Sequence, residues 1–113
     1  MIVDPSGYIV TNAHMVEGAR RIRILLPLPP NENALLQAEG KRRILEAKVV
    51  GTHQESDLAL LKVDAQNLPA LWLANPRLVR QGQLVLAVGS PEDWQDSVTL
   101  GVISSVARQP DPN

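Results

Sequence analysis

The sequence predicts an all-β fold built from short strands in a barrel or sandwich. Segments rich in Val, Ile and Leu alternate with turns that contain proline or glycine, and none has the length and period of a convincing long helix. Aromatic residues make up only 3% of the chain and Phe is absent, so the core must be aliphatic. A chain of 113 residues is sufficient for one small domain or for part of a larger one.

The first part of the chain predicts a hairpin followed by a strand with one solvent-exposed face. Residues 2–3 and Tyr8–Thr11 read as the arms, and Asp4–Gly7 (Asp-Pro-Ser-Gly) as a β-turn. The first arm is unusually short, so we expect further residues upstream of this sequence. Arg20–Leu26 alternates arginine with isoleucine, which indicates a strand with one solvated face, and Pro27 is expected to end it.

The middle of the chain predicts a long loop and two more strands. The loop is residues 31–41, within which Ala34–Glu39 could form one or two helical turns. Ile44–Gly51 is expected to be a strand. Leu58–Val63 is nearly all apolar, which is typical of a strand buried on both faces.

The last third predicts a connector followed by two strands. Asp64–Gln81 contains two prolines and reads as extended. Gln83–Val88 is expected to be a buried strand and Ser97–Ala107 the last one. The tail from Gln109 onward carries no structural signal.

The composition excludes several classes of site. The net charge is −1, and the small basic clusters at 20–23 and 41–43 read as solvated faces, so we expect no nucleic-acid binding. There is no cysteine, and no motif predicts a metal or cofactor site. No apolar run is long enough to span a bilayer, and no signal peptide is visible.

His14 and Asp57 are the candidate catalytic residues. His14 follows a predicted strand, and histidine is the side chain suited to general base catalysis near neutral pH. Asp57 opens an apolar strand and could accept a hydrogen bond from the His14 ring. Taken alone, a single histidine is more often a packed or surface residue, and such an aspartate a turn residue. His53, four residues before Asp57, is interpreted as a loop residue rather than a metal ligand.

Three ordered blocks of sequence resemble HtrA/Deg-type trypsin-like serine proteases. The first is residues 2–16 with Thr-Asn-Ala-His, and the second combines residues 47–52 with 56–63, which contain Ser-Asp-Leu-Ala-Leu-Leu. The third combines 82–91 with 97–104. Together they cover most of the chain, so the resemblance is specific.

This resemblance implies a chymotrypsin-like double β-barrel with the active site between two six-stranded barrels. It would place residues 1–64 in the first barrel, 65–80 in a connector, and 81–113 at the start of an incomplete second barrel. It also implies that His14 is the general base and Asp57 its orienting acid. Unfolded or peptide substrates and a periplasmic or other extracytoplasmic location follow from the same resemblance.

Three departures limit what the resemblance implies. The segment 27–41 is longer than the tight hairpin usual in the family, and residues 90–94 replace a more usual Asn-Pro-Phe-Gly run. Most importantly, the chain contains no Gly-Asn-Ser-Gly-Gly or Gly-x-Ser-x-Gly segment, so it holds neither nucleophile nor oxyanion hole. Ser90, Ser104 and Ser105 are poor substitutes, because the first is held between Gly and Pro and the others lie in a predicted strand. We therefore expect the chain alone to be inactive.

A partial second barrel would leave strand edges and apolar side chains uncovered. Val85, Val88, Val98 and Val102 would then face solvent or a partner. We expect self-association, through strand exchange between copies.

Three interpretations of function remain open at this stage. The chain is part of an active trypsin-like endopeptidase, a non-catalytic binding or chaperone-like module on the same fold, or a structural protein whose His14 and Asp57 are coincidental. A separation beyond about 5 Å between the His14 ring and the Asp57 carboxylate would favour the third.

Overall fold

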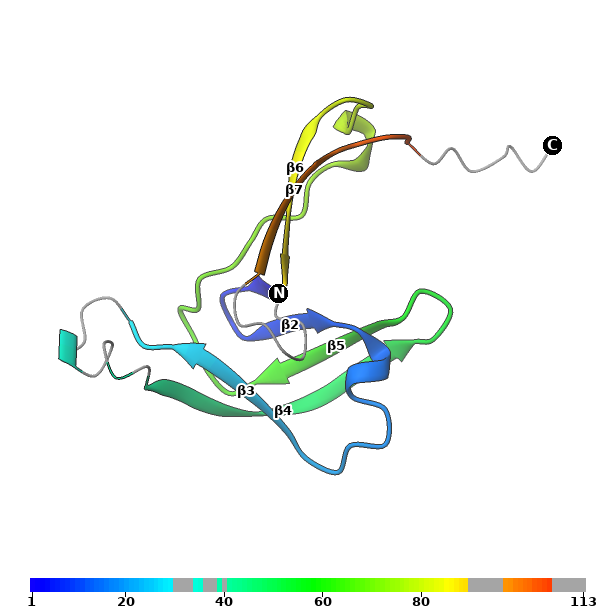
Figure 1. Ribbon diagram of the computed structural model, residues 1–113. Coiled ribbons are helices and arrows are strands. Elements are labelled where there is room, and N and C mark those ends of the chain that lie inside the picture. The colour runs from blue at the N-terminus through cyan, green and yellow to red at the C-terminus, as the bar shows by residue number, and fades with distance from the viewer. Residues whose placement is uncertain (30–33, 36–38, 40, 90–96, 107–113) are drawn as a thin grey trace. The chain divides into compact units, whose positions relative to one another are not determined.

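The computed structural model describes residues 1–29, 34–35, 39, 41–89 and 97–106, and the chain divides into two compact units, Met1–Leu73 and Ala74–Asn113. Figure 1 shows that the described elements are mostly strands. In chain order they are β1 (Ile2–Asp4), β2 (Tyr8–Thr11), the 3₁₀ turn η1 (Ala13–Met15), β3 (Ile22–Pro27), β4 (Arg42–His53), β5 (Leu58–Val63), the 3₁₀ turn η2 (Pro76–Leu78), β6 (Leu84–Gly89) and β7 (Ser97–Val102).

The first unit is one antiparallel sheet in the order β1-β2-β5-β4-β3 (Figure 1). Strand β5 is central, and its Leu61 lies opposite Ile9 of β2 on one side and Val49 of β4 on the other. The register of β4 against β5 shifts between Val49 and Gly51, which is a β-bulge.

The core of this unit lies on one face of the sheet and is aliphatic, as expected from the composition. Alternate residues of β5 point into it because side chains of a strand alternate between faces. Its buried members are Ile9, Val16, Ala59, Leu61, Val63, Ala65 and Leu68, with Ile2, Ile22, Ile24, Leu26, Leu45 and Ala47 packed against them.

The residues that follow β5 are hydrogen-bonded to this first sheet. Leu68 is buried, and its N–H donates to the carbonyl of Pro5 at 3.1 Å. The N–H of Leu71 donates to the carbonyl of Ile2 at 2.9 Å. The first half of the expected 65–80 connector therefore packs on β1 and its turn.

The Asp4–Gly7 turn is confirmed. The N–H of Gly7 donates to the Asp4 carbonyl at 3.1 Å, and the N–H of Ser6 donates to Asp4 Oδ1 at 2.8 Å. Gly7 is buried with φ of +103°, and a Cβ at this position would lie 2.5 Å from the carbonyl oxygen of Val63. Only glycine fits this position.

The second unit contains η2 and the two-stranded sheet β6-β7. The two strands pair in regular register from Leu84↔Val102 to Gly89↔Ser97. The prediction of a buried strand at 83–88 is wrong, because every residue of β6 is exposed. Among the described residues β6 has one neighbouring strand and no second layer over either face. The four valines named above are exposed, as expected.

Several predicted strand limits also differ. The Leu58–Val63 strand is buried on one face rather than two, since Leu58 is 46% exposed and Lys62 is intermediate. Strand β4 is longer than the predicted 44–51 and includes His53, which the sequence had placed in a loop. Strand β7 ends at Val102 because its partner β6 begins at Leu84, so the prediction of a strand to residue 107 is too long.

Some predictions fall outside the described residues. They are the departure at 90–94 that includes Ser90, the tail from 107, and the middle of the helical turns expected at 34–39. Of those turns, residues 34–35 are helical and the Glu39 N–H donates to the Leu35 carbonyl at 3.0 Å, whereas 36–38 lie outside the described residues. None of the helices in the described part of the chain has the length and hydropathy needed to cross a bilayer.

Candidate active site

His14 lies in η1, directly after β2. The turn is held by two apolar anchors three residues apart, Ala13 at 1% exposure and Val16 at 8%. The N–H of Val16 donates to the Ala13 carbonyl at 3.1 Å and closes the turn. Between these anchors the His14 side chain points outward and is 64% exposed.

Asp57 lies in the turn that joins β4 to β5, at the same end of the sheet as η1. Thr11 of β2 pairs with Ala59 of β5, so the segments that follow β2 and precede β5 meet there although they are far apart in sequence. Asp57 closes the turn by donating its N–H to the Gln54 carbonyl at 3.1 Å, with φ of +52°. Aspartate and asparagine tolerate this left-handed conformation better than most residues.

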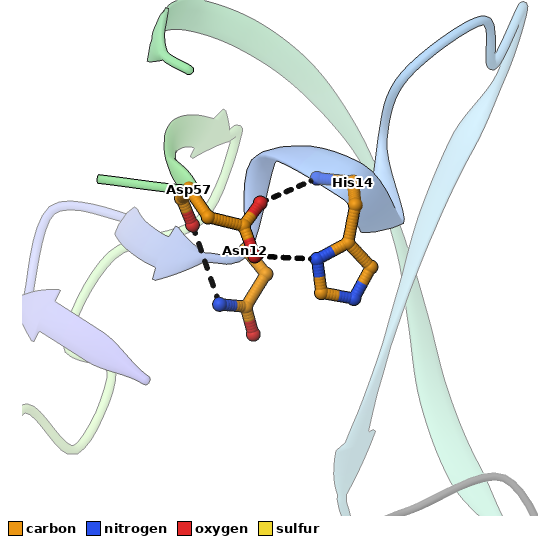
Figure 2. A network of polar contacts seen from close by, with 3 residues as sticks. All are labelled: Asn12, His14 and Asp57. Atoms are coloured by element: carbon orange, nitrogen blue, oxygen red, sulfur yellow. Dashed lines mark hydrogen bonds and ion pairs between the residues drawn. The ribbon is translucent and has the colours of Figure 1, made fainter. Parts of the chain in front are cut away.

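The two segments are joined by main-chain contacts as well. The carbonyl of Asp57 accepts the N–H of Ala13 at 3.1 Å. It also accepts a hydrogen bond from Asn12 Nδ2 at 3.3 Å (Figure 2). The position of Asp57 is therefore set by the backbone of the His14 turn.

The His14 ring and the Asp57 carboxylate are in direct contact. His14 Nδ1 lies 2.5 Å from Asp57 Oδ2, and the His14 main-chain N–H donates to Oδ1 at 2.9 Å (Figure 2). Next to an ionised carboxylate, Nδ1 carries the proton, which leaves the Nε2 lone pair available. Figure 2 shows Nε2 on the side of the ring away from Asp57.

The pKa of Asp57 is lowered below its ordinary value of 3.8. The main cause is the hydrogen bond donated by the His14 main chain, followed by the hydrogen bond from the His14 ring. Both donors stabilise the ionised form. Asp57 is therefore a carboxylate at neutral pH, and the 43% exposure of its side chain to water also favours the ionised form.

His53 contacts the Asp57 turn but not the His14–Asp57 pair directly. Its Nδ1 lies 2.8 Å from Ser56 Oγ and accepts the Ser56 main-chain N–H at 3.3 Å. Within the described residues no three His, Cys, Asp or Glu side chains converge on a position that could hold a metal ion. The sequence had not singled out Asn12 or Ser56, although both lie inside the motifs that flagged His14 and Asp57.

Comparison with known proteins decides the family. The sequence model of one protein family, described as the trypsin-like peptidase domain, matches residues 1–113. The chain belongs to this family. The HtrA/Deg resemblance and the all-β, chymotrypsin-like fold predicted from the sequence are confirmed by the relatives and solved structures that follow.

Two curated relatives carry the description "Probable periplasmic serine endoprotease DegP-like". The protein of Halomonas elongata is 43% identical over 107 residues, which is 95% of this chain and 20% of the relative. That of Pseudomonas savastanoi pv. phaseolicola is 37% identical over the same length and covers the same shares.

A solved structure, the HtrA-type protease AlgW with a decapeptide, matches at a TM-score of 0.74 and 34% identity. The match covers 97% of this chain and 30% of that one. The chain spans about a fifth of the length of the curated relatives.

Proposed function

We propose that this chain carries the base and the orienting acid of a trypsin-like serine endopeptidase, with His14 and Asp57 in these roles. The observation that supports the proposal is the 2.5 Å contact between His14 Nδ1 and Asp57 Oδ2, which leaves Nε2 free to accept a proton. In this family's reaction the base takes the proton of a serine hydroxyl as the hydroxyl attacks a peptide carbonyl, and later gives it to the leaving amine.

Asp57 acts through His14 in this mechanism. Its carboxylate holds the ring in the tautomer with the proton on Nδ1, and it stabilises the imidazolium that forms when Nε2 accepts a proton. Both effects depend on the negative charge of Asp57, which the carboxyl carries at neutral pH because its pKa lies below the ordinary 3.8.

No Gly-Asn-Ser-Gly-Gly segment occurs among the 113 residues, and we propose that the nucleophile and the oxyanion hole lie outside them. We propose that residues 1–64 belong to the first barrel, 65–80 to the connector and 81–113 to the start of the second barrel. A nucleophile would be supplied by a segment of the Gly-Asn-Ser-Gly-Gly type. The chain on its own is then inactive toward peptides.

Two experiments test this assignment. The purified chain should release no peptide from casein, and hydrolysis that His14→Ala abolishes would show that the chain is active alone. The parent gene should encode the serine segment downstream, and the protein that contains it should lose activity in both His14→Ala and Asp57→Asn variants. A parent gene without that segment would instead support a non-catalytic binding module.

Polypeptides are the proposed substrates of the complete enzyme, and an extracytoplasmic compartment is its proposed location. Support comes from relatives described as periplasmic endoproteases and from the decapeptide bound to the HtrA-type structure. Secretion of a reporter fused to the parent protein's own N-terminus would test the location.

Copies of the chain are proposed to associate through β6 and β7. The two strands pair only with each other in the described residues, so each has a free edge. Apolar side chains on them are exposed, with Val88 at 75% and Val98 at 61%. Light scattering should show oligomers of the wild-type chain, and Val88→Lys should weaken this association. Val50→Lys, at an exposed strand valine of the first unit, is the matched control. A monomer at high concentration would contradict the proposal.

A further inference from the structure

The face of the first sheet opposite its core carries a row of cations. Lys48 of β4 lies directly opposite Lys62 of β5, and Lys62 lies opposite Tyr8 of β2. Ile22 pairs with Ala47, so Arg21 extends the same row beyond Lys48. Like charges directly opposite one another destabilise a sheet, so this arrangement is not explained by folding alone.

The outer cations of this row have partners within the described residues, whereas the central one has none there. Arg21 forms an ion pair with Glu46. Lys62 Nζ donates to the Val63 carbonyl at 2.6 Å and lies 5.6 Å from the centre of the Tyr8 ring. Among the described residues, no carboxylate pairs with Lys48.

These side chains line an open hollow of about 620 Å³. Its charged lining residues are Arg20, Arg21, Lys48, Lys62, Glu46 and Asp64. Four cations against two carboxylates give a local charge of 4 − 2 = +2, whereas the whole chain carries −1. The hollow therefore has a local charge opposite in sign to that of the protein as a whole.

An apolar surface adjoins the cations on the same face. Leu60 is two residues from Lys62 on β5, and it lies opposite Val10 of β2. With Leu58, these residues line a shallower hollow of about 410 Å³. Together the two hollows present positive charge beside aliphatic side chains.

We propose that this face binds an acidic peptide segment that also carries aliphatic side chains. Its carboxylates would lie over Lys48, between Arg21 and Lys62, and its aliphatic groups over Val10 and Leu60. An inorganic anion would not use the apolar hollow. A bilayer surface would not reach cations that line a depression, and few aromatic side chains are present to stack nucleic-acid bases. The surface does not include His14 or Asp57, so the inference is independent of the proposed protease activity.

Titration of the ¹⁵N-labelled chain with acetyl-Glu-Leu-Glu-Glu-Leu-Glu-amide tests this inference. Shifts should occur at Arg21 and in the β2, β4 and β5 residues of this face, and binding should weaken as salt is raised, because exposed charges are screened. Lys48→Glu should weaken binding by about tenfold. Arg77→Glu, the same charge reversal at an exposed position of the second unit, should leave binding unchanged.

The other outcomes overturn the proposal. They are no binding up to millimolar peptide, equal binding of the peptide with Gln in place of Glu, or equal losses in the Lys48→Glu and Arg77→Glu variants. Tighter binding to anionic phospholipid vesicles or to inorganic phosphate than to the peptide would assign the face to a different ligand. A folded Lys48→Glu spectrum shows that any loss of binding is not a loss of structure.

Discussion

Asp57 accepts hydrogen bonds from both the main chain and the ring of His14, through Oδ1 at 2.9 Å and Oδ2 at 2.5 Å. A carboxylate held by two donors of one residue has a fixed orientation relative to that residue's backbone. The ring is therefore oriented against the same main chain that carries it. This arrangement does not require burial, which explains how an ordered pair can form where both side chains are largely exposed.

Replacement of Asp57 by Asn should change the tautomer of His14. Asparagine tolerates the φ of +52°, so the turn is retained. Its side chain has one accepting and one donating atom. If the asparagine oxygen accepts the hydrogen bond from the His14 main-chain N–H, its NH₂ group faces Nδ1. Nδ1 must then accept a hydrogen bond, so the ring proton moves to Nε2. Long-range ¹H–¹⁵N spectra of the imidazole should show this exchange. In the complete enzyme the same change should lower kcat by about 10⁴, as in other triads.

The control for this variant is Asp57→Glu, which keeps both oxygens and the charge. It should retain the Nδ1–H tautomer to a greater extent than Asp57→Asn. A wild-type ring that carries its proton on Nε2 would contradict the proposed role of Asp57.

Acid should destabilise the chain through Asp57 and Asp4. Hydrogen bonds from Ser6, first from its hydroxyl and then from its main chain, lower the pKa of Asp4, and those from His14 lower the pKa of Asp57. A folded-state pKa below the ordinary 3.8 means that the unfolded chain binds more protons. The stabilisation is present above pH 3.8 and is lost as pH falls through the folded values. The urea concentration at the unfolding midpoint should decrease as the pH is lowered below about 4. The decrease should be less steep in the Asp4→Asn/Asp57→Asn double variant. Identical slopes would contradict this.

The sequence was sufficient to nominate the site because motif and topology agree. Thr-Asn-Ala-His follows one strand and Ser-Asp-Leu-Ala precedes another, and antiparallel pairing of β2 with β5 brings those ends together. The 43-residue separation carries no geometric information, so the contact itself could not be derived from the residues. Nor could the Asn12 bond to the Asp57 carbonyl, since an asparagine side chain has many possible partners in a turn.

Burial was the less predictable part of the fold. An apolar strand such as Leu58–Val63 has the composition of a strand covered on both faces, but composition does not say whether a second layer is present. In β5 only Ala59, Leu61 and Val63 are buried, and β6 lacks any cover in the described residues. Strand ends depend similarly on the partner strand, which explains why β7 stops at Val102.

His53 should stabilise the turn that presents Asp57. Its Nδ1 accepts the Ser56 N–H, so it acts only while that nitrogen is unprotonated. His53→Ala should therefore raise amide hydrogen exchange at Ser56 and Asp57. His53→Asn should restore protection, because its oxygen can accept the same N–H. Equal exchange in the wild type and in His53→Ala would show that the turn does not depend on His53.

Gly7→Ala should be the most destabilising single-methyl change in the first sheet. A Cβ at Gly7 would lie 2.5 Å from the Val63 carbonyl oxygen, 3.0 Å from a Val63 methyl and 3.1 Å from the Ala65 carbonyl oxygen. Two of these atoms belong to the backbone. They cannot move away without separating the β1–β2 turn from the end of β5. With the positive φ, the cost should be on the order of 3 kcal/mol in the free energy of unfolding.

Gly18→Ala is the control, since Gly18 has φ of +70° but its added methyl would meet no described atom within 4 Å beyond its chain neighbours. It should cost about 1 kcal/mol, from backbone strain alone. Urea denaturation of both variants measures the difference, and equal losses would show that the backbone clash at Gly7 is relieved by movement of the turn.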